Sequence, residues 1–114
     1  MALIYKIFRQ DEFTDLEAAG ETLGAPVDLA DGFIHFSTAE QVAETAGKHF
    51  AGEDGLKLLA VNPAPLGDAL KWEPSRGGAL FPHLYRPLRT SDVLWSRDLP
   101  LVDGAHDFSG LIDG

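Results

Sequence analysis

The sequence DGFIHFSTAEQ at residues 31–41 describes a short apolar strand that runs into the start of a helix. Strand alternation from residue 32 onward predicts that three side chains share one face: Phe33, His35 and Ser37. Two overlapping capping-box patterns follow, Ser37 with Glu40 and Thr38 with Gln41. An imidazole and a hydroxyl therefore lie beside a helix N-terminus, whose free N–H groups favour anions. This arrangement is typical of a site for a phosphate-bearing ligand.

The rest of the chain alternates between strand-like and helix-like segments, which predicts one α+β domain. Strands are expected at 3–8, 32–36, 56–61, 69–73, 80–85 and 93–96. Helices are expected at 11–19, closed by Gly20, and at about 39–49. Residues 24–31 and 74–78 read as a loop and a turn, and Pro82 indicates the edge or the start of a strand. The domain is expected to span 1–102, with 103–114 as a loosely ordered tail.

The composition argues against several classes of protein. The chain of 114 residues has no cysteine, which excludes disulfide frameworks, thiolate nucleophiles and cysteine-based zinc sites. Its net charge of −9 argues against a general nucleic-acid binder, because such proteins need a broad basic surface. No apolar run approaches the length of a transmembrane helix. We therefore expect a cytoplasmic protein that does not enter the membrane, with its oligomeric state left open.

A second group of chemically capable residues lies at 71–86. In an extended segment Phe81, His83 and Tyr85 point to one side, where they could stack a planar heterocycle or hydrogen-bond a sugar. Glu73 could bind ribose hydroxyls or stabilise an oxocarbenium ion. Three basic residues could supply local positive charge to the same pocket: Lys6, Arg76 and Arg86.

Each of these residues also has a purely structural interpretation. His35 can be a core histidine, with Ser37 only a helix cap. The aromatic block can be a cross-strand cluster, and Glu73 can be an exposed carboxylate opposite Lys71. Their concentration in two short blocks nevertheless favours a pocket. The four histidines show no paired metal-ligand spacing, so no metal site is expected, and Walker, dinucleotide, HExxH and nucleophile-elbow motifs are all absent.

Up to about residue 102 the chain resembles the family catalogued as domain of unknown function 952. The resemblance rests on 31–41, on Trp72-Glu73 and on FPHLYRPL at 81–88, and Ile4-Tyr5-Lys6 and 58–61 fit as well. Members look like small bacterial proteins. The resemblance implies an ADP-ribosyltransferase-like fold, in which a split antiparallel or mixed sheet and two main helices surround a central cleft. That cleft binds NAD in better-known relatives.

The resemblance also implies roles for individual residues. Ser37-Thr38 is similar to the end of the aromatic-x-Ser-Thr strand of ADP-ribosyltransferases, and Ile34-His35-Phe36 looks like a strand of the RNA 2′-phosphotransferase branch. Tyr5-Lys6 stands near the first-strand position that holds the adenosine ribose. Three residues are expected to be catalytic: His35, Glu73 and His83. Six are expected to bind the ligand: Lys6, Ser37, Thr38, Arg76, Tyr85 and Arg86.

We therefore expect a cleft that binds a nucleotide-like ligand of the NAD or ADP-ribose type and that supports ADP-ribosyl or phosphate transfer. NAD would be a ligand or substrate, and no other cofactor is implied. Two alternatives stay open. The cleft could belong to a metabolite sensor in which no bond breaks, or the aromatic block could form the seam of a homodimeric interaction protein.

Overall fold

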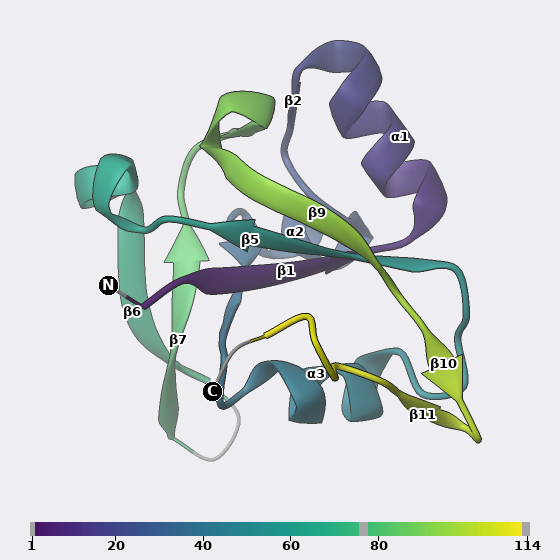
Figure 1. The fold of residues 1–114 in the computed structure, drawn as a ribbon. Coiled ribbons are helices and arrows are strands. Elements are labelled where there is room, and N and C mark those ends of the chain that lie inside the picture. Colours follow the sequence, from purple (N-terminus) through teal and green to yellow (C-terminus); the bar gives the residue numbers. More distant parts are fainter. Residues whose placement is uncertain (1, 76–77, 113–114) are drawn as a thin grey trace.

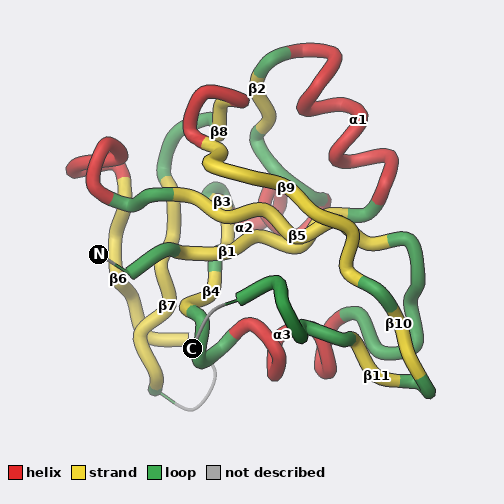
Figure 2. Tube along the Cα trace, viewed as in Figure 1, coloured by secondary structure: helices red, strands yellow, loops and turns green. Residues whose placement is uncertain are grey.

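The computed structural model describes residues 2–75 and 78–112 and has the expected mixed α+β architecture, built on antiparallel strand pairs (Figures 1 and 2). Its helices are α1 Gln10–Ala19, α2 Pro26–Asp31, α3 Val42–His49, and the 3-10 turns η1 Ala64–Ala69 and η2 Thr90–Asp92. Its strands are β1 Ile4–Phe8, β2 Glu21–Thr22, β3 Ile34–His35, β4 Ser37–Thr38, β5 Leu56–Val61, β6 Leu70–Ser75, β7 Ala79–Leu84, β8 Leu88–Arg89, β9 Val93–Leu99, β10 Leu101–Val102 and β11 Ala105–His106.

The main sheet has four strands in the order β4-β1-β5-β9. The two inner strands are the apolar runs that the sequence indicates, since all of β1 and nearly all of β5 are buried. Alternation along β1 sends Ile4 and Phe8 into one core cluster, and Tyr5 and Ile7 into a second. Figure 1 shows α1 and α3 on opposite sides of these strands. The sheet therefore carries a hydrophobic layer on both faces.

A smaller sheet has the order β3-β7-β6, and here the structure corrects three expectations. Of the predicted strand 32–36, only Ile34–His35 form a strand, β3, which joins this sheet, and the next pair of residues forms β4, which joins the main sheet. Pro82 lies inside the central strand β7, not at an edge or start. Its carbonyl accepts a hydrogen bond from Phe36 N at 2.9 Å where β3 has ended, so the missing N–H removes no bond to β6. Part of the predicted turn 74–78 belongs to β6, which extends to Ser75.

Two corrections concern helices. The predicted loop 24–31 contains α2, which begins with proline in its first turn and ends at Gly32 with a left-handed φ of 84°. The helix predicted at 39–49 begins only at Val42, so Ser37 is a strand residue and not its cap. One half of a predicted capping box is present, because the side chain of Gln41 accepts a hydrogen bond from Thr38 N at 3.0 Å.

The segment expected to be a loose tail, 103–114, begins directly after the short strand β10. Within it, β11 pairs with β10, and His106 Nε2 lies 2.8 Å from the carbonyl oxygen of Glu53. Three partly buried side chains pack against the second core cluster: Phe108, Leu111 and Ile112. These residues therefore add contacts to the domain. How loosely the segment is held stays a prediction.

Candidate functional site

The two motifs meet through the pairing of β3 with β7. This pairing sets His35 directly opposite His83, and the two rings lie 5.3 Å apart at 70°. Phe33 stacks on His83 with 4.2 Å between ring centroids and an interplanar angle of 29°. The alternation that puts Phe33 and His35 on one strand face is thus present, and it brings together residues separated by nearly fifty positions in the sequence.

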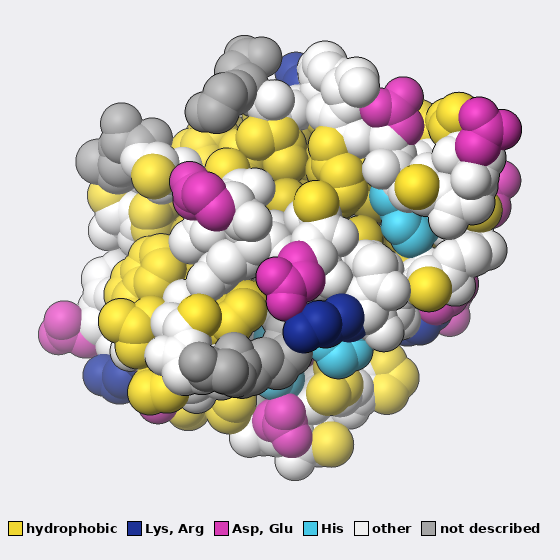
Figure 3. All heavy atoms as spheres, turned by 90° about the horizontal axis from the view of Figure 1, so that it is seen from below, with side chains coloured by type: hydrophobic (Ala, Val, Ile, Leu, Met, Phe, Trp, Pro, Cys, Tyr) yellow, Lys and Arg dark blue, Asp and Glu magenta, His cyan; other side chains and the backbone are white. Residues whose placement is uncertain are grey.

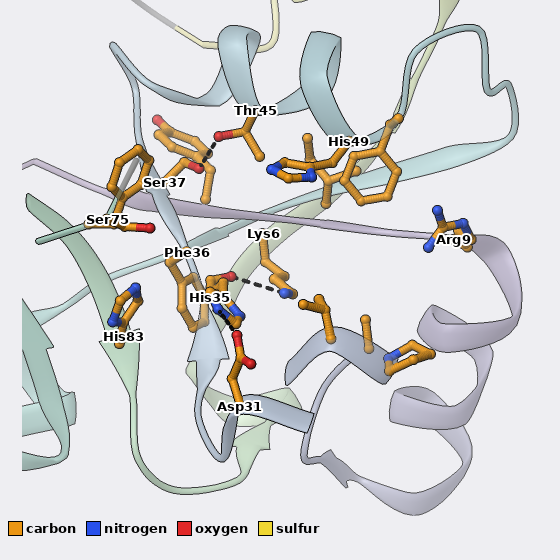
Figure 4. A pocket seen from close by; sticks show the side chains of 17 residues that line it. Lys6, Arg9, Asp31, His35, Phe36, Ser37, Thr45, His49, Ser75 and His83 are labelled. Atoms are coloured by element: carbon orange, nitrogen blue, oxygen red, sulfur yellow. Dashed lines mark hydrogen bonds and ion pairs between the residues drawn. The ribbon is translucent and has the colours of Figure 1, made fainter. Parts of the chain in front are cut away.

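A cavity of about 500 Å³ opens beside this meeting point. Figure 4 shows it bounded by α3 on one side and by α2 on the other, with β1 running between them. β4 pairs with only Ile4 and Tyr5, so the edge of β1 beyond Tyr5 borders the cavity. Four of the predicted site residues line it: Lys6, His35, Ser37 and His83.

Four polar residues form a network at one wall of the cavity: Lys6, Asp31 and His35 line it, and Asp28 lies behind them. The carboxylate of Asp28 is buried and accepts hydrogen bonds from Lys6 Nζ at 2.7 Å, from the amide N–H of Ala25 at 2.7 Å and from the amide N–H of His35 at 3.0 Å. Its Oδ1 also lies 2.6 Å from His35 Nδ1, while Asp31 Oδ2 lies 2.9 Å from His35 Nε2. Both ring nitrogens of His35 therefore face carboxylates.

The electrostatics of Asp28 follow from these contacts. Burial alone would raise the pKa of its carboxyl, but the hydrogen bonds from His35 and Lys6 and the charge of Lys6 outweigh burial and lower the pKa to about 2. Lys6 Nζ also donates to the carbonyl oxygen of His35 at 3.0 Å. The network joins β1, α2 and β3 at the cavity wall.

Opposite this network, the hydroxyls of Ser37 and Thr45 are 2.9 Å apart. Figure 4 shows this pair linking β4 to α3 at the same end of the cavity as Ser75 and His83. Ser37 is almost fully buried, so its oxygen is presented only to the protein and to the cavity. If the hydrogen bond between these two hydroxyls rearranges, either hydroxyl can donate a hydrogen bond to a ligand hydroxyl or accept one from it.

His83 belongs to a second hydrogen-bonded group. Oε1 of Glu73 lies 2.9 Å from His83 Nδ1 and accepts a hydrogen bond from the hydroxyl of Tyr85 at 2.7 Å. The hydrogen bond from Tyr85 is the largest cause that lowers the pKa of Glu73, and the hydrogen bond from His83 is the second. The hydrogen bond between Tyr85 and Glu73 also raises the pKa of Tyr85. His83 is only 4% exposed, and its Nε2 has no hydrogen-bond partner among the residues that the structure describes.

Other predicted site residues lie away from the main cavity. Thr38, Glu73, Tyr85 and Arg86 are not part of its lining. Arg86 forms a bidentate pair with Asp92 at 2.9 and 3.0 Å, and with Tyr85 it borders a smaller cavity of about 230 Å³. Arg76 lies outside the described residues. Of the aromatic block proposed as a dimer seam, Phe81 and His83 are buried, whereas Tyr85 is exposed.

Sequence reasoning missed several residues at the cavity or directly behind its wall. The predicted loop 24–31 contains Asp31, which lines the cavity, and Asp28, which lies behind it; the proline in the first turn of α2 together with Gly32 is the signal that indicates their helix. Thr45 and His49 reach the cavity from α3, and Arg9 lies at its far end (Figure 4). Arg9 is hydrogen-bonded to Glu53 at 2.9 Å. No short motif marks these three residues.

Three features bear on the expected partners: possible metal ligands, the apolar character of the helices and the surface charge. Within residues 2–75 and 78–112, no three His, Asp, Glu or Cys side chains are placed to hold a metal ion. No helix in this part of the chain combines the length and the apolar character needed to cross a membrane. On the face shown in Figure 3, Lys and Arg side chains are scattered and form no continuous patch. The absence of general nucleic-acid binding stays a prediction.

Comparison with known proteins gives a family and a set of solved structures. The sequence matches the family model described as "Protein of unknown function (DUF952)" over residues 7–96. The fold is similar to the X-ray crystal structure of protein CC0527 from Caulobacter crescentus, with 55% identity over 93% of this chain and 94% of that chain and a TM-score of 0.89. The solution NMR structure of CC0527 is similar too, with 53% identity over 96% of both chains and a TM-score of 0.86. No curated protein matches.

Proposed function

The chain belongs to the family described as protein of unknown function (DUF952), and on that premise we propose that its cavity binds a small nucleotide-like ligand of the NAD or ADP-ribose type. The proposal includes the finer fold assignment, an ADP-ribosyltransferase-like split sheet around the cavity. It also includes the reaction, which is transfer of an ADP-ribosyl group or of phosphate.

The observation that carries the proposal is the shared cavity of about 500 Å³ between the two sequence motifs. Its volume lies within the range of about 300–1,000 Å³ that small-molecule sites usually have. One end carries the hydroxyl pair of Ser37 and the imidazole of His83, and Arg9 lies at the other end. Aromatic and aliphatic side chains lie between these polar groups, an arrangement that suits a ligand with sugar, base and phosphate parts.

The arrangement around His83 supports a transfer step. In ADP-ribosyl transfer the bond between nicotinamide and ribose C1′ breaks, nicotinamide leaves with the electron pair, and an acceptor atom bonds to C1′ and gives up its proton. Nε2 of His83 is the base that takes this proton, and Glu73 orients the ring through Nδ1 at 2.9 Å. Since Glu73 does not line the cavity, its contribution in this scheme is made through His83.

Calorimetry with NAD, ADP-ribose and nicotinamide, followed by product analysis, tests the proposal. We expect binding of NAD or ADP-ribose, and we expect His35→Ala and Glu73→Ala to lower turnover by about a hundredfold to a thousandfold while leaving the fold intact. His106→Ala and Glu40→Ala are matched controls, since both residues lie outside the cavity lining. Absence of binding by all three compounds, or full turnover in both site variants, would refute the assignment.

A second candidate, a sensor that binds without breaking a bond, is favoured by one observation. Both ring nitrogens of His35 are engaged by carboxylates, at 2.6 Å to Asp28 and 2.9 Å to Asp31, so this histidine is held as a structural group. Binding of NAD with no nicotinamide or other product released over many hours would support the sensor against the transferase.

A further inference from the structure

Among the described residues, one buried side-chain nitrogen has no hydrogen-bond partner, and it belongs to a residue of the proposed ligand site, His83. Nε2 of His83 is buried, yet none of the described residues is within hydrogen-bonding reach of it. Buried polar atoms in folded proteins almost always have a partner, so each exception calls for an explanation. Here the rest of the residue lines the cavity, which indicates that the missing partner comes from there.

The contacts of the other ring nitrogen decide which kind of partner this is. Oε1 of Glu73 lies 2.9 Å from Nδ1 and also accepts the Tyr85 hydroxyl. An ionised carboxylate only accepts hydrogen bonds, so Nδ1 must carry the proton. In the neutral ring Nε2 then presents a lone pair. The inference concerns this neutral ring, whose bare acceptor atom is buried.

The position of this lone pair is fixed before any ligand arrives. Phe33 stacks on the ring at 4.2 Å, and the pairing of β3 with β7 holds the backbone of His83 opposite His35. The hydrogen bond from Nδ1 to Glu73 prevents the ring from turning over. A preorganised acceptor of this kind loses little entropy on binding and selects the ligand group that can donate to it.

We infer that Nε2 of His83 receives a hydrogen bond from the ligand, so that this end of the cavity takes a neutral donor, a sugar hydroxyl or a carboxamide N–H. The bridging diphosphate of a ligand of the NAD type and an ionised carboxylate can only accept, and they belong elsewhere in the cavity. The inference rests on the proposed function, because it takes the cavity to be the ligand site. Within NAD it assigns the nicotinamide–ribose part to the His83 end.

The tautomer can be measured without any ligand. Two-bond ¹H–¹⁵N NMR spectra of the labelled protein near neutral pH should show His83 with Nδ1 protonated and Nε2 unprotonated. Glu73→Gln should raise the fraction of ring with a proton on Nε2, whereas Glu40→Gln, the same change at an exposed residue of the turn before α3, should not. A predominantly Nε2-protonated ring in the unmodified protein overturns the inference.

Ligand probes then separate donors from acceptors. Nicotinamide and nicotinate differ in that only the first can donate, and D-ribose and dimethyl phosphate, an ionised diester without an O–H group, form a second such comparison. We expect nicotinamide or ribose to shift the Nε2 resonance, to bind about tenfold more tightly than the acceptor-only compound, and to lose that preference in His83→Phe. Equal or stronger effects of nicotinate and dimethyl phosphate overturn the inference.

The failures of the two proposals differ. NAD binding with no change at Nε2 overturns the inference and leaves the proposed function standing. A response of Nε2 to nicotinamide or ribose, with no binding of NAD or ADP-ribose, supports the inference and refutes the proposed function. If neither nicotinamide nor ribose shifts the Nε2 resonance, the inference is overturned, even when Nδ1 is found to carry the proton.

Discussion

Replacing Asp28 by asparagine should be among the most damaging conservative changes in this protein. The carboxylate accepts from Lys6, from two backbone N–H groups and from the ring of His35, and Lys6 itself is only 6% exposed. Asparagine keeps the volume but removes the charge and turns one acceptor into a donor. Lys6 is then a buried cation without its counterion, a situation that typically destabilises a protein by about 3–5 kcal/mol.

Urea unfolding followed by circular dichroism measures this change. Asp31→Asn is the matched control, because its carboxylate is 47% exposed and makes one contact, at 2.9 Å to His35; it should lower the free energy of unfolding by about 1 kcal/mol or less. If Asp28→Asn no longer folds, adding Lys6→Met should restore folding, since the unpaired charge is gone. A loss in Asp28→Asn that is no larger than the loss in Asp31→Asn would refute the reasoning.

Three further results are expected. Because the folded-state pKa of Asp28 is about 2, below its ordinary 3.8, its contribution of about 2 kcal/mol should be complete above about pH 4 and should be lost as the pH falls through 2; stability measured against pH should lack this fall in Asp28→Asn. Gly24→Ala should lower the free energy of unfolding by more than Gly32→Ala, because both positions have positive φ but only the Cβ at 24 would collide with Asp28; equal losses of about 1 kcal/mol would show that the collision is relieved. Ser37→Ala should cost about 1 kcal/mol in urea unfolding through loss of the bond to Thr45, and an unchanged midpoint would contradict that bond.

The inner strands of the main sheet and the end of α1 were predictable because their signals are local. The inner strands β1 and β5 are short apolar runs, and α1 ends at Gly20 with a φ of 81° where the sequence indicates a helix end. Such features depend on neighbouring residues alone, so a single sequence is enough to predict them.

What escaped prediction depends on tertiary contacts. The six residues of α2 bury only Asp28, so the helix shows no apolar stripe. The chain passes from the smaller sheet to the main sheet at Phe36, and there the amide of Phe36 is bonded to Pro82, a residue far along the sequence. Alternation shows which side chains share a face, but it cannot show at which residue a strand changes partners.

The site divides in the same way. The sequence pattern brings His35 and His83 to a common place, because both lie on alternating strands that later pair. Asp28 was missed because its partners Lys6 and His35 are 22 and 7 residues away, and its importance comes from burial and not from spacing. Arg86 was predicted to bind the ligand but lies outside the main cavity, and its charge is paired with Asp92 six residues later.

The ion-paired group of Lys6, Asp28 and His35 also limits how this protein can diverge. Each member belongs to a different secondary-structure element, and Lys6 and Asp28 are both removed from water. A single substitution that removes the charge of Lys6 or of Asp28 leaves the other charge buried without its partner. We therefore expect related proteins to change both positions together or to keep both. Related proteins should then carry a few alternative pairs of residues at positions 6 and 28, with few mixtures between them.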